Sequence, residues 1–374
     1  MSPAPPGRTA RLRTALGQMG LDAYLSQRAA DVTYLTGSWG FPAAVYVPAE
    51  QRDEPCLLVV PAADLPGAVA PGAYTLRAVA LDEPWPAAIA AAMDAAGRGM
   101  APPAAGPAPV SVGRLAVSGL GGEVLGAARA RARRVDESDL LDRLRRRWGR
   151  DTDEREGLAR ARRIALAGLR SLLGTTRAGL RECDLVGPVE EEMRRARAEG
   201  LSPSRFAAGP RSAHANPAPS ARVLRAGDMG FAGVGPVWEG YASEITRAFH
   251  LGPPPPEALR LIDGLRRARE AAIALLQPGR TGGDVFRRVA ALLEAEGLGG
   301  LLPHRLGAPL GGLLHPMLAP GEREALVVGD MLTVDPGLYV AGLGGVRIGD
   351  AVEVTASGPV VLSETVPGWT QIVT

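Results

Sequence analysis

Hydrophobic and polar residues follow two different patterns along the chain, and the change between them divides the sequence into two parts. In the first part, residues 8–20 have helical periodicity. Short apolar runs bounded by turn residues then predict strands at 22–27, 43–48 and 56–61, with a short helix after the first of them. Helices and strands that alternate in this way predict a small α/β domain.

A stretch rich in Pro, Ala and Gly at 99–110 predicts a loop, and a strand at 114–119 and a helix at 122–132 follow it. The next segment, 135–154, is charged and helical in its periodicity, so it is a candidate link between domains. We therefore predict an N-terminal α/β domain over 1–138, a helical linker over 139–152 and a larger domain over 153–374.

The second part contains a weak internal repeat. A helix ending near 171–174 leads through a turn to a second helix that ends in "AEGL" at 198–201. A helix ending near 274–279 leads to another that ends in "AEGL" at 295–298. Strands follow each helix pair, so we predict an α+β fold in which two pseudo-twofold helix pairs cover a curved antiparallel sheet and enclose a site between the halves.

The composition is that of a globular protein, with 46% hydrophobic and 22% charged residues and a net charge of +2. Neither a membrane-spanning run nor a secretory signal is evident, so we expect a cytoplasmic protein with no membrane partner. The low net charge argues against a nucleic-acid partner. All 42 basic residues counted as Lys or Arg are arginine, which excludes lysine Schiff bases and lysine-bound pyridoxal phosphate, and we expect no cofactor.

Four segments of the second part carry a family resemblance. They read "GPRSAHANPAPSARVLRAGD" (209–228), "GYASEITRAF" (240–249), "GAPLGGLLHP" (307–316) and "LTVDPGLYVAGLGGVRIGDAVEVT" (332–355). In this order and spacing they resemble the motifs of the pita-bread family of prolidase, aminopeptidase P and creatinase, and the first part resembles that family's creatinase-type N-terminal domain. The resemblance implies the pita-bread fold and, by analogy, a homodimer.

Metal-dependent members of that family hold two divalent ions with two Asp, one His and two Glu. The resemblance places the equivalent positions of this chain at Gly233, Glu244, Ala308, Asp335 and Gly349. Three of the five have no donor atom, and two carboxylates cannot cage two ions at about 3.5–4 Å separation. We therefore predict that no metal is bound, although His250 and His304 leave an improvised site open.

The resemblance also indicates catalytic residues. His214 matches the histidine that acts as acid and base in creatinase, and His315 matches the histidine of the peptidases' "HE" pair, although Pro316 replaces the Glu. Two imidazoles facing one cavity can transfer protons near neutral pH. The alternative for each histidine is a structural role, hydrogen-bonded within its loop.

Two carboxylates complete the predicted catalytic set. Glu244 could act as an acid or base of raised pKa, or could only pair with Arg247 or Arg347. Asp335 could orient the substrate, or could only form the turn of "DPG".

A second group of residues is predicted to bind substrate. Arg347 could hold an anionic group, or could neutralise Glu244 and Asp335 in place of cations. The loss of metal ligands at Gly233 and Ala308 would widen the pocket. The remaining members are aromatic. Tyr241 is among them, although core packing is the favoured interpretation for it. Trp39 and Phe41 lie on a loop that closes the partner's site in dimeric family members.

These expectations combine into a functional hypothesis. We predict a metal-independent enzyme on a prolidase/creatinase scaffold that acts on a small amide, amidine or amino-acid-derived molecule by C–N hydrolysis, elimination or isomerisation, in specialised metabolism. The alternatives are a non-catalytic pseudo-peptidase that binds a peptide or protein partner, and an ordinary X-Pro metallopeptidase.

Overall fold

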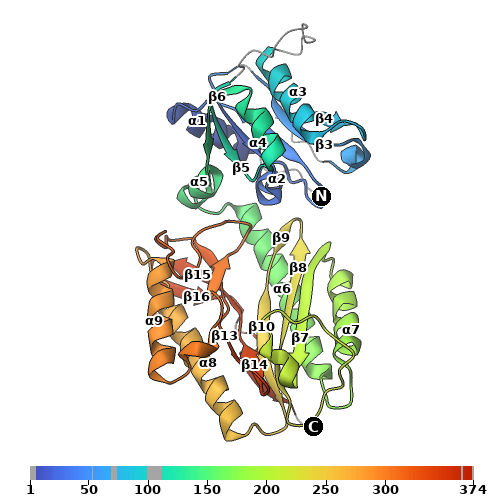
Figure 1. Cartoon of the computed structure of the whole chain (residues 1–374), viewed down its shortest axis with the longest axis vertical. Helices are drawn as coiled ribbons and strands as arrows, with labels where there is room; N and C mark the ends of the chain where they lie inside the picture. Colours follow the sequence, from blue (N-terminus) through green and yellow to red (C-terminus); the bar gives the residue numbers. More distant parts are fainter. Residues whose placement is uncertain (1–5, 53, 69–73, 99–111, 364, 373–374) are drawn as a thin grey trace. The chain divides into compact units, whose positions relative to one another are not determined.

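The computed structural model describes residues 6–52, 54–68, 74–98, 112–363 and 365–372. These residues form two compact units, divided between Arg147 and Trp148 (Figure 1). The predicted domain limits stay a prediction, and the loop predicted at 99–110 lies outside the described residues.

The first unit contains a six-stranded mixed sheet. Its strand order is β4-β3-β2-β1-β5-β6, and β2 is antiparallel to both of its neighbours while the other pairs are parallel. The strands are β1 (Ala23–Ser26), β2 (Ala44–Pro48), β3 (Cys56–Pro61), β4 (Tyr74–Val79), β5 (Val112–Ser118) and β6 (Ala132–Glu137). The helices are α1 (Pro6–Gln18), α2 (Ala29–Thr36), η1 (Ala62–Gly67), α3 (Trp85–Arg98), α4 (Gly122–Arg129) and α5 (Leu140–Trp148). Strands β1 and β2 are buried along their whole length, which explains their continuous apolar sequences.

The second unit contains two helix pairs, α6 (Thr152–Thr175) with α7 (Glu182–Arg195) and α8 (Pro256–Ala274) with α9 (Gly282–Ala295). Local sequence fixes where three of these helices begin. Asp151 and Glu154 form a reciprocal capping box at α6, and the Thr281 side chain accepts a hydrogen bond from the Asp284 N–H at α9. Helix α8 begins at a proline, which is well suited to the first helical position.

Short strands lie between the two helix pairs. One sheet has the order β17-β10-β8-β7 with β9 paired to β8, a second has the order β11-β12-β15-β16, and β13 pairs with β14. Their bounds are β7 (Gly200–Ala208), β8 (Met229–Trp238), β9 (Tyr241–Ala242), β10 (Ile245–Leu251), β11 (Gly307–Pro309), β12 (Met331–Val334), β13 (Gly337–Val340), β14 (Gly344–Arg347), β15 (Asp350–Thr355), β16 (Gly358–Val361) and β17 (Trp369–Ile372), with the short helices η2 (Gly209–Ala213) and η3 (Gly299–Leu301). Backbone hydrogen bonds between Thr246 and Gly349, 3.2 and 2.9 Å long, join the first sheet to the second.

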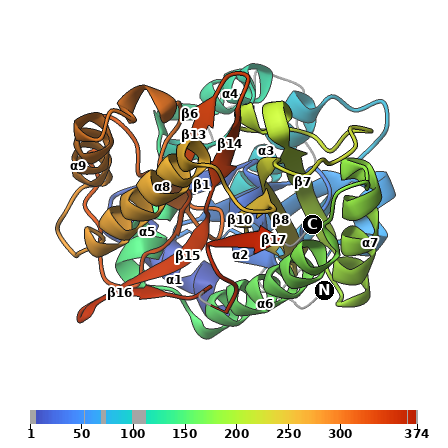
Figure 2. The ribbon, with the colours of Figure 1, turned by 90° about the horizontal axis from the view of Figure 1, so that it is seen from below.

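Each helix pair packs its apolar face on one of these sheets. Helices α6 and α7 share a buried cluster with β7, β8 and β10, and α8 and α9 share another with β12, β14 and β15. Figure 2 shows α6 and α7 on one side of β8 and β10 and α8 on the other. The predicted α+β fold is confirmed. Among the described residues, none of the helices combines the length and the apolar character needed to cross a membrane.

Candidate functional site

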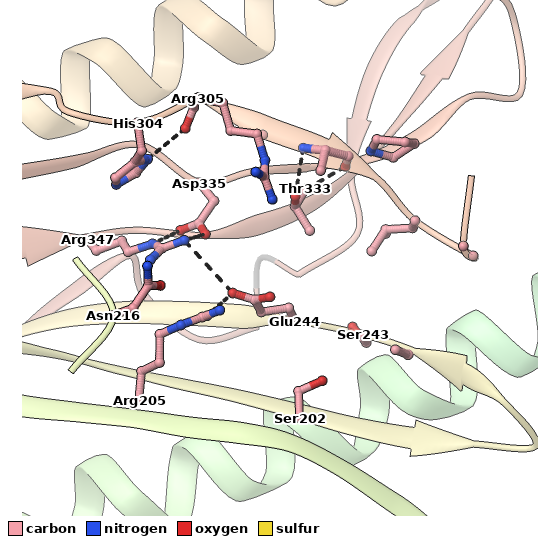
Figure 3. A pocket seen from close by; sticks show the side chains of 17 residues that line it. Ser202, Arg205, Asn216, Ser243, Glu244, His304, Arg305, Thr333, Asp335 and Arg347 are labelled. Carbon is pink, nitrogen blue, oxygen red and sulfur yellow. Dashed lines mark hydrogen bonds and ion pairs between the residues drawn. The ribbon is translucent and has the colours of Figure 1, made fainter. Parts of the chain in front are cut away.

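A cavity of about 260 Å³ lies in the second unit, between the ends of its sheets. Strand β7 contributes Ser202 and Arg205, β9 contributes Ala242, and the turn before β10 contributes Ser243 and Glu244. The segment 304–312 around β11 forms the opposite wall, and Thr333, Asp335 and Arg347 complete the lining together with Asn216 (Figure 3). The motifs that are far apart in sequence therefore meet at one cavity.

A buried ion pair forms the floor of this cavity. Arg347 donates from Nε to Asp335 Oδ1 at 2.8 Å and from Nη2 to Oδ2, and its Nη1 donates to the Ala215 carbonyl at 2.9 Å. Burial by itself lowers the pKa of Arg347, but the adjacent Asp335 carboxylate outweighs that effect and raises the pKa above its ordinary value. Burial raises the pKa of Asp335, and Arg347 opposes that rise. Asp335 and Arg347 therefore form a bidentate ion pair with each other.

Glu244 lies beside this pair and uses only one of its carboxylate oxygens. Its Oε1 accepts a hydrogen bond from Arg205 Nη1 and lies 4.0 Å from Arg347 Nη2. Its Oε2 has no partner among the residues that the structure describes. Arg247, the other predicted partner, instead pairs with Asp350.

Two neighbouring residues on the opposite wall differ in their bonding. His304 is held by the Arg305 carbonyl on Nδ1 at 2.7 Å and by the Tyr339 hydroxyl on Nε2 at 2.9 Å. Burial lowers the pKa of His304, so the ring is neutral at pH 7. The Arg305 guanidinium reaches into the cavity and makes no hydrogen bond or ion pair with the described residues.

Ser243 adds a buried hydroxyl to the cavity wall. Its side chain is 2% exposed, and its Oγ has no hydrogen-bond partner among the described residues. A buried hydroxyl without a partner is uncommon in folded proteins, and a ligand group is one way to satisfy it.

The residues at the five ligand positions do not fit a pair of divalent ions. Both carboxylates, Glu244 and Asp335, already bind arginines. A Cβ atom at Gly349 would lie 2.7 Å from Asp335 Oδ1, so this ion pair occupies the space that a longer side chain there would need. No group of three or more His, Cys, Asp or Glu side chains among the described residues could hold a metal ion.

Arginine occupies the region of a missing ligand on the other sheet. Arg205 pairs directly across β7 and β8 with Gly233, and its Cβ would lie 3.7 Å from a Cβ at that glycine. The atom nearest to a Cβ at Gly233 is Thr246 Oγ1, at 2.9 Å. Side chains paired across two strands share one face of a sheet, so Arg205 lies on the face that a side chain at 233 would share. The guanidinium then reaches Glu244.

The structure brings only some of the predicted site residues together. Glu244, Asp335, Arg347 and Ala308 line the cavity, and Gly233 lies beside it on β8. The remaining predicted residues are not among the lining residues: His214, His315, Tyr241, Trp39 and Phe41.

Each of these remaining residues has a different environment. His214 is exposed just after η2, and Tyr241 packs on Gly157 in an apolar cluster. Trp39 and Phe41 are partly exposed residues of the first unit. The homodimer in which they would close a partner's site stays a prediction.

His315 points to a carboxylate outside the cavity lining. Its Nδ1 lies 2.6 Å from Glu322 Oε2, which also accepts from the Met317 N–H at 2.9 Å. Burial alone raises the pKa of Glu322, but backbone N–H groups of Glu324 and Met317 and the His315 ring lower it to about 2. Glu322 therefore stays ionised and fixes the loop that carries His315.

Sequence reasoning missed Arg205, Arg305 and Ser243. Arg305 directly follows His304 and lies three residues before Ala308, a predicted pocket position, so the sequence could have indicated it as a cavity residue. The pairing of Arg205 with Gly233 depends on strand register, and the sequence alone does not provide it.

Comparison with known proteins identifies the family. Residues 156–356 match the model of "Metallopeptidase family M24", and residues 8–105 match the "Creatinase/Prolidase N-terminal domain". The putative dipeptidase YkvY of Bacillus subtilis is 31% identical over 218 residues, which are 58% of this chain and 60% of that protein. The chain thus aligns with less than two thirds of the length of this curated relative.

Solved structures show the same fold. The X-Pro aminopeptidase of Thermotoga maritima has a TM-score of 0.82 at 22% identity, with 98% of this chain and 99% of that chain covered. The Xaa-Pro dipeptidase of Bacillus anthracis has a TM-score of 0.81 at 23% identity, with the same coverage. The predicted pita-bread fold with a creatinase-type N-terminal domain is therefore confirmed.

The predicted reaction is not confirmed. The prediction of a metal-independent enzyme of specialised metabolism that acts on small amides or amidines is wrong, because the relatives and structural neighbours are named dipeptidases, prolidases and X-Pro peptidases. Nothing in these comparisons supports a lyase or isomerase. The family and its neighbours are peptidases, which are hydrolases, and this chain belongs to metallopeptidase family M24.

Proposed function

We propose that this chain binds short peptides in the cavity of its second unit and does not hydrolyse them through the metal pair of its family. The main support is that arginines pair with Glu244 and Asp335, the two carboxylates present at the family's ligand positions. The peptide class comes from the names of the relatives, which are dipeptidases and X-Pro peptidases.

The cavity suits a small polar ligand better than an apolar one. Its volume of about 260 Å³ lies just below the ~300–1,000 Å³ typical of small-molecule sites, which favours a ligand of one or two amino-acid residues. Charged side chains from both walls face its interior, so a polar backbone can replace water without leaving buried groups unsatisfied.

The chemistry available from this chain's own residues is binding and orientation. Arg347 is fixed by Asp335, so it acts as a rigid part of the floor. His304 is neutral and held on both ring nitrogens, which leaves neither free to accept a proton from a ligand. Asp335 binds Arg347 through both carboxylate oxygens, so Glu244 Oε2 is the carboxylate oxygen of the lining that remains open to a ligand.

The experiment is a titration of the dipeptide Ala-Pro by isothermal calorimetry, with and without EDTA, and an assay for released proline after incubation with Mn²⁺ or Co²⁺. We expect saturable binding that EDTA does not change, and no proline. Absence of binding to Ala-Pro in both buffers would refute the proposal.

A metal-dependent dipeptidase is the second candidate, and the names of the relatives favour it. It would need metal ligands other than the five positions of the family. Release of proline that requires Mn²⁺ or Co²⁺ and stops with EDTA would establish it in place of peptide binding alone.

A further inference from the structure

Two groups facing the cavity keep hydrogen-bonding atoms without a partner among the described residues, and they belong to side chains of opposite charge. One is the Arg305 guanidinium, which makes no hydrogen bond or ion pair with the described residues. The other is the Oε2 atom of Glu244, since both arginine contacts of that carboxylate are made by Oε1. Every other ionised side chain of the lining has an ion-pair partner there.

The two groups come from opposite walls. Arg305 lies two residues before β11, and Glu244 lies immediately before β10. Figure 3 shows both side chains pointing into the space between these walls. A ligand in the cavity therefore meets a positive group on one side and a negative group on the other.

We infer that the cavity is a site for a zwitterion, with the ligand's carboxylate on Arg305 and its ammonium group on Glu244 Oε2. This assignment rests on the proposed function, and it adds that both free ends of a short peptide are recognised. A guanidinium matches a carboxylate bidentately, and an ammonium group donates to a carboxylate oxygen. The lining carries three arginines against two carboxylates, so the ligand's negative end meets an excess of positive charge.

A ligand with one charged group would satisfy only Arg305 or only Glu244 Oε2. A dianion such as phosphate on Arg305 would place its second charge near Glu244, which repels it. A cation on Glu244 Oε2 would leave Arg305 without a partner among the described residues. A zwitterion satisfies both groups at once and leaves the two existing arginine contacts of Glu244 in place.

The buried Ser243 hydroxyl gives the same cavity a neutral partner for the ligand. It has no hydrogen-bond partner among the described residues and precedes Glu244 in sequence. The carbonyl of a peptide bond held between Arg305 and Glu244 offers this hydroxyl an acceptor, also in Ala-Pro, whose peptide nitrogen carries no hydrogen.

The test uses four probes and three variants of the full chain. The probes are Ala-Pro, its C-terminal amide, its N-acetyl derivative and the doubly capped form. The variants are Arg305→Gln, Glu244→Gln and Arg323→Gln, where Arg323 is an exposed arginine outside the cavity lining that serves as the matched control. Arg305 is exposed and Gln at 244 keeps an acceptor for Arg205, so both variants should fold, which circular dichroism checks.

With the wild-type protein we expect each cap to weaken binding about 10- to 100-fold, the size of a lost charge-assisted hydrogen bond. Arg305→Gln should bind Ala-Pro and its amide equally, and should still discriminate against the acetyl form. Glu244→Gln should show the reverse pattern, and Arg323→Gln should match the wild type.

Equal binding of all four probes by the wild type would overturn the zwitterion assignment and leave peptide binding intact. Loss of both discriminations together in Arg305→Gln would also overturn the assignment of one end to each residue. If no probe binds, the proposed function fails and this inference fails with it.

Discussion

The ion pair between Asp335 and Arg347 gives the sharpest prediction about stability. Arg347→Met removes the partner of a carboxylate that is 7% exposed. Removing one partner of a buried pair typically costs about 3–5 kcal/mol, because the remaining charge has no compensation. We expect a loss of that size in the free energy of unfolding of the second unit, measured by urea denaturation at pH 7.

The stability loss in Arg347→Met should depend on pH. Burial already raises the pKa of Asp335, and in Arg347→Met the opposing guanidinium is gone, so the pKa rises further. A carboxyl whose folded pKa is raised destabilises the folded state above its unfolded pKa, and acidification relieves this by up to about 1.4 kcal/mol per pH unit. The loss in Arg347→Met should therefore be smaller at pH 5 than at pH 8.

Two variants serve as controls. Arg347→Met with Asp335→Leu removes both charges and should recover most of the lost stability. Arg155→Met breaks an ion pair with Glu353 in which the arginine is 45% exposed, and it should cost less than about 1 kcal/mol. A loss in Arg347→Met no larger than in Arg155→Met, or one that does not change with pH, would refute the reasoning.

Further predictions concern single side chains and are measured by urea unfolding. The pKa of Glu322 is held at about 2 against an ordinary 4.5, so its contribution to the free energy of unfolding is complete above pH 5 and lost toward pH 2. Glu322→Gln should therefore cost about 1–3 kcal/mol at pH 7 and little at pH 2. An equal cost at both pH values would contradict this. Gly349→Ala places a Cβ 2.7 Å from the Asp335 carboxylate and should cost about 1–3 kcal/mol. Gly174→Ala, in α6 with open space at its Cβ, should instead stabilise by about 0.5–1 kcal/mol; the same sign for both glycines would refute this. Ser243→Ala removes a buried hydroxyl without a partner among the described residues and should change stability by less than about 1 kcal/mol.

The fold was predictable because its signals are local or repeated. Helix starts at Asp151 and Thr281 have capping residues in the sequence itself. The two helix pairs repeat with similar lengths and endings. The motif spacing also brought Glu244, Asp335 and Arg347 to one site in the prediction, and they line one cavity.

The interactions between side chains were less predictable, because they depend on packing in three dimensions. Arg205 reaches Glu244 only because β7 pairs with β8 in a register that places Arg205 opposite Gly233. His315 was predicted to face the cavity from its motif, but its ring binds Glu322 on the same loop. The predicted functional class was wrong because it was inferred from the missing metal ligands alone, whereas the relatives and structural neighbours are named dipeptidases, prolidases and X-Pro peptidases.

Arg205 and Arg347 hold the two carboxylates at the family's metal-ligand positions, Glu244 and Asp335. The metal content of the purified protein after dialysis against Mn²⁺, measured by inductively coupled plasma mass spectrometry, tests whether these carboxylates still bind ions. We expect far less than one ion per chain. About two ions per chain, the content of a two-metal site, would contradict it.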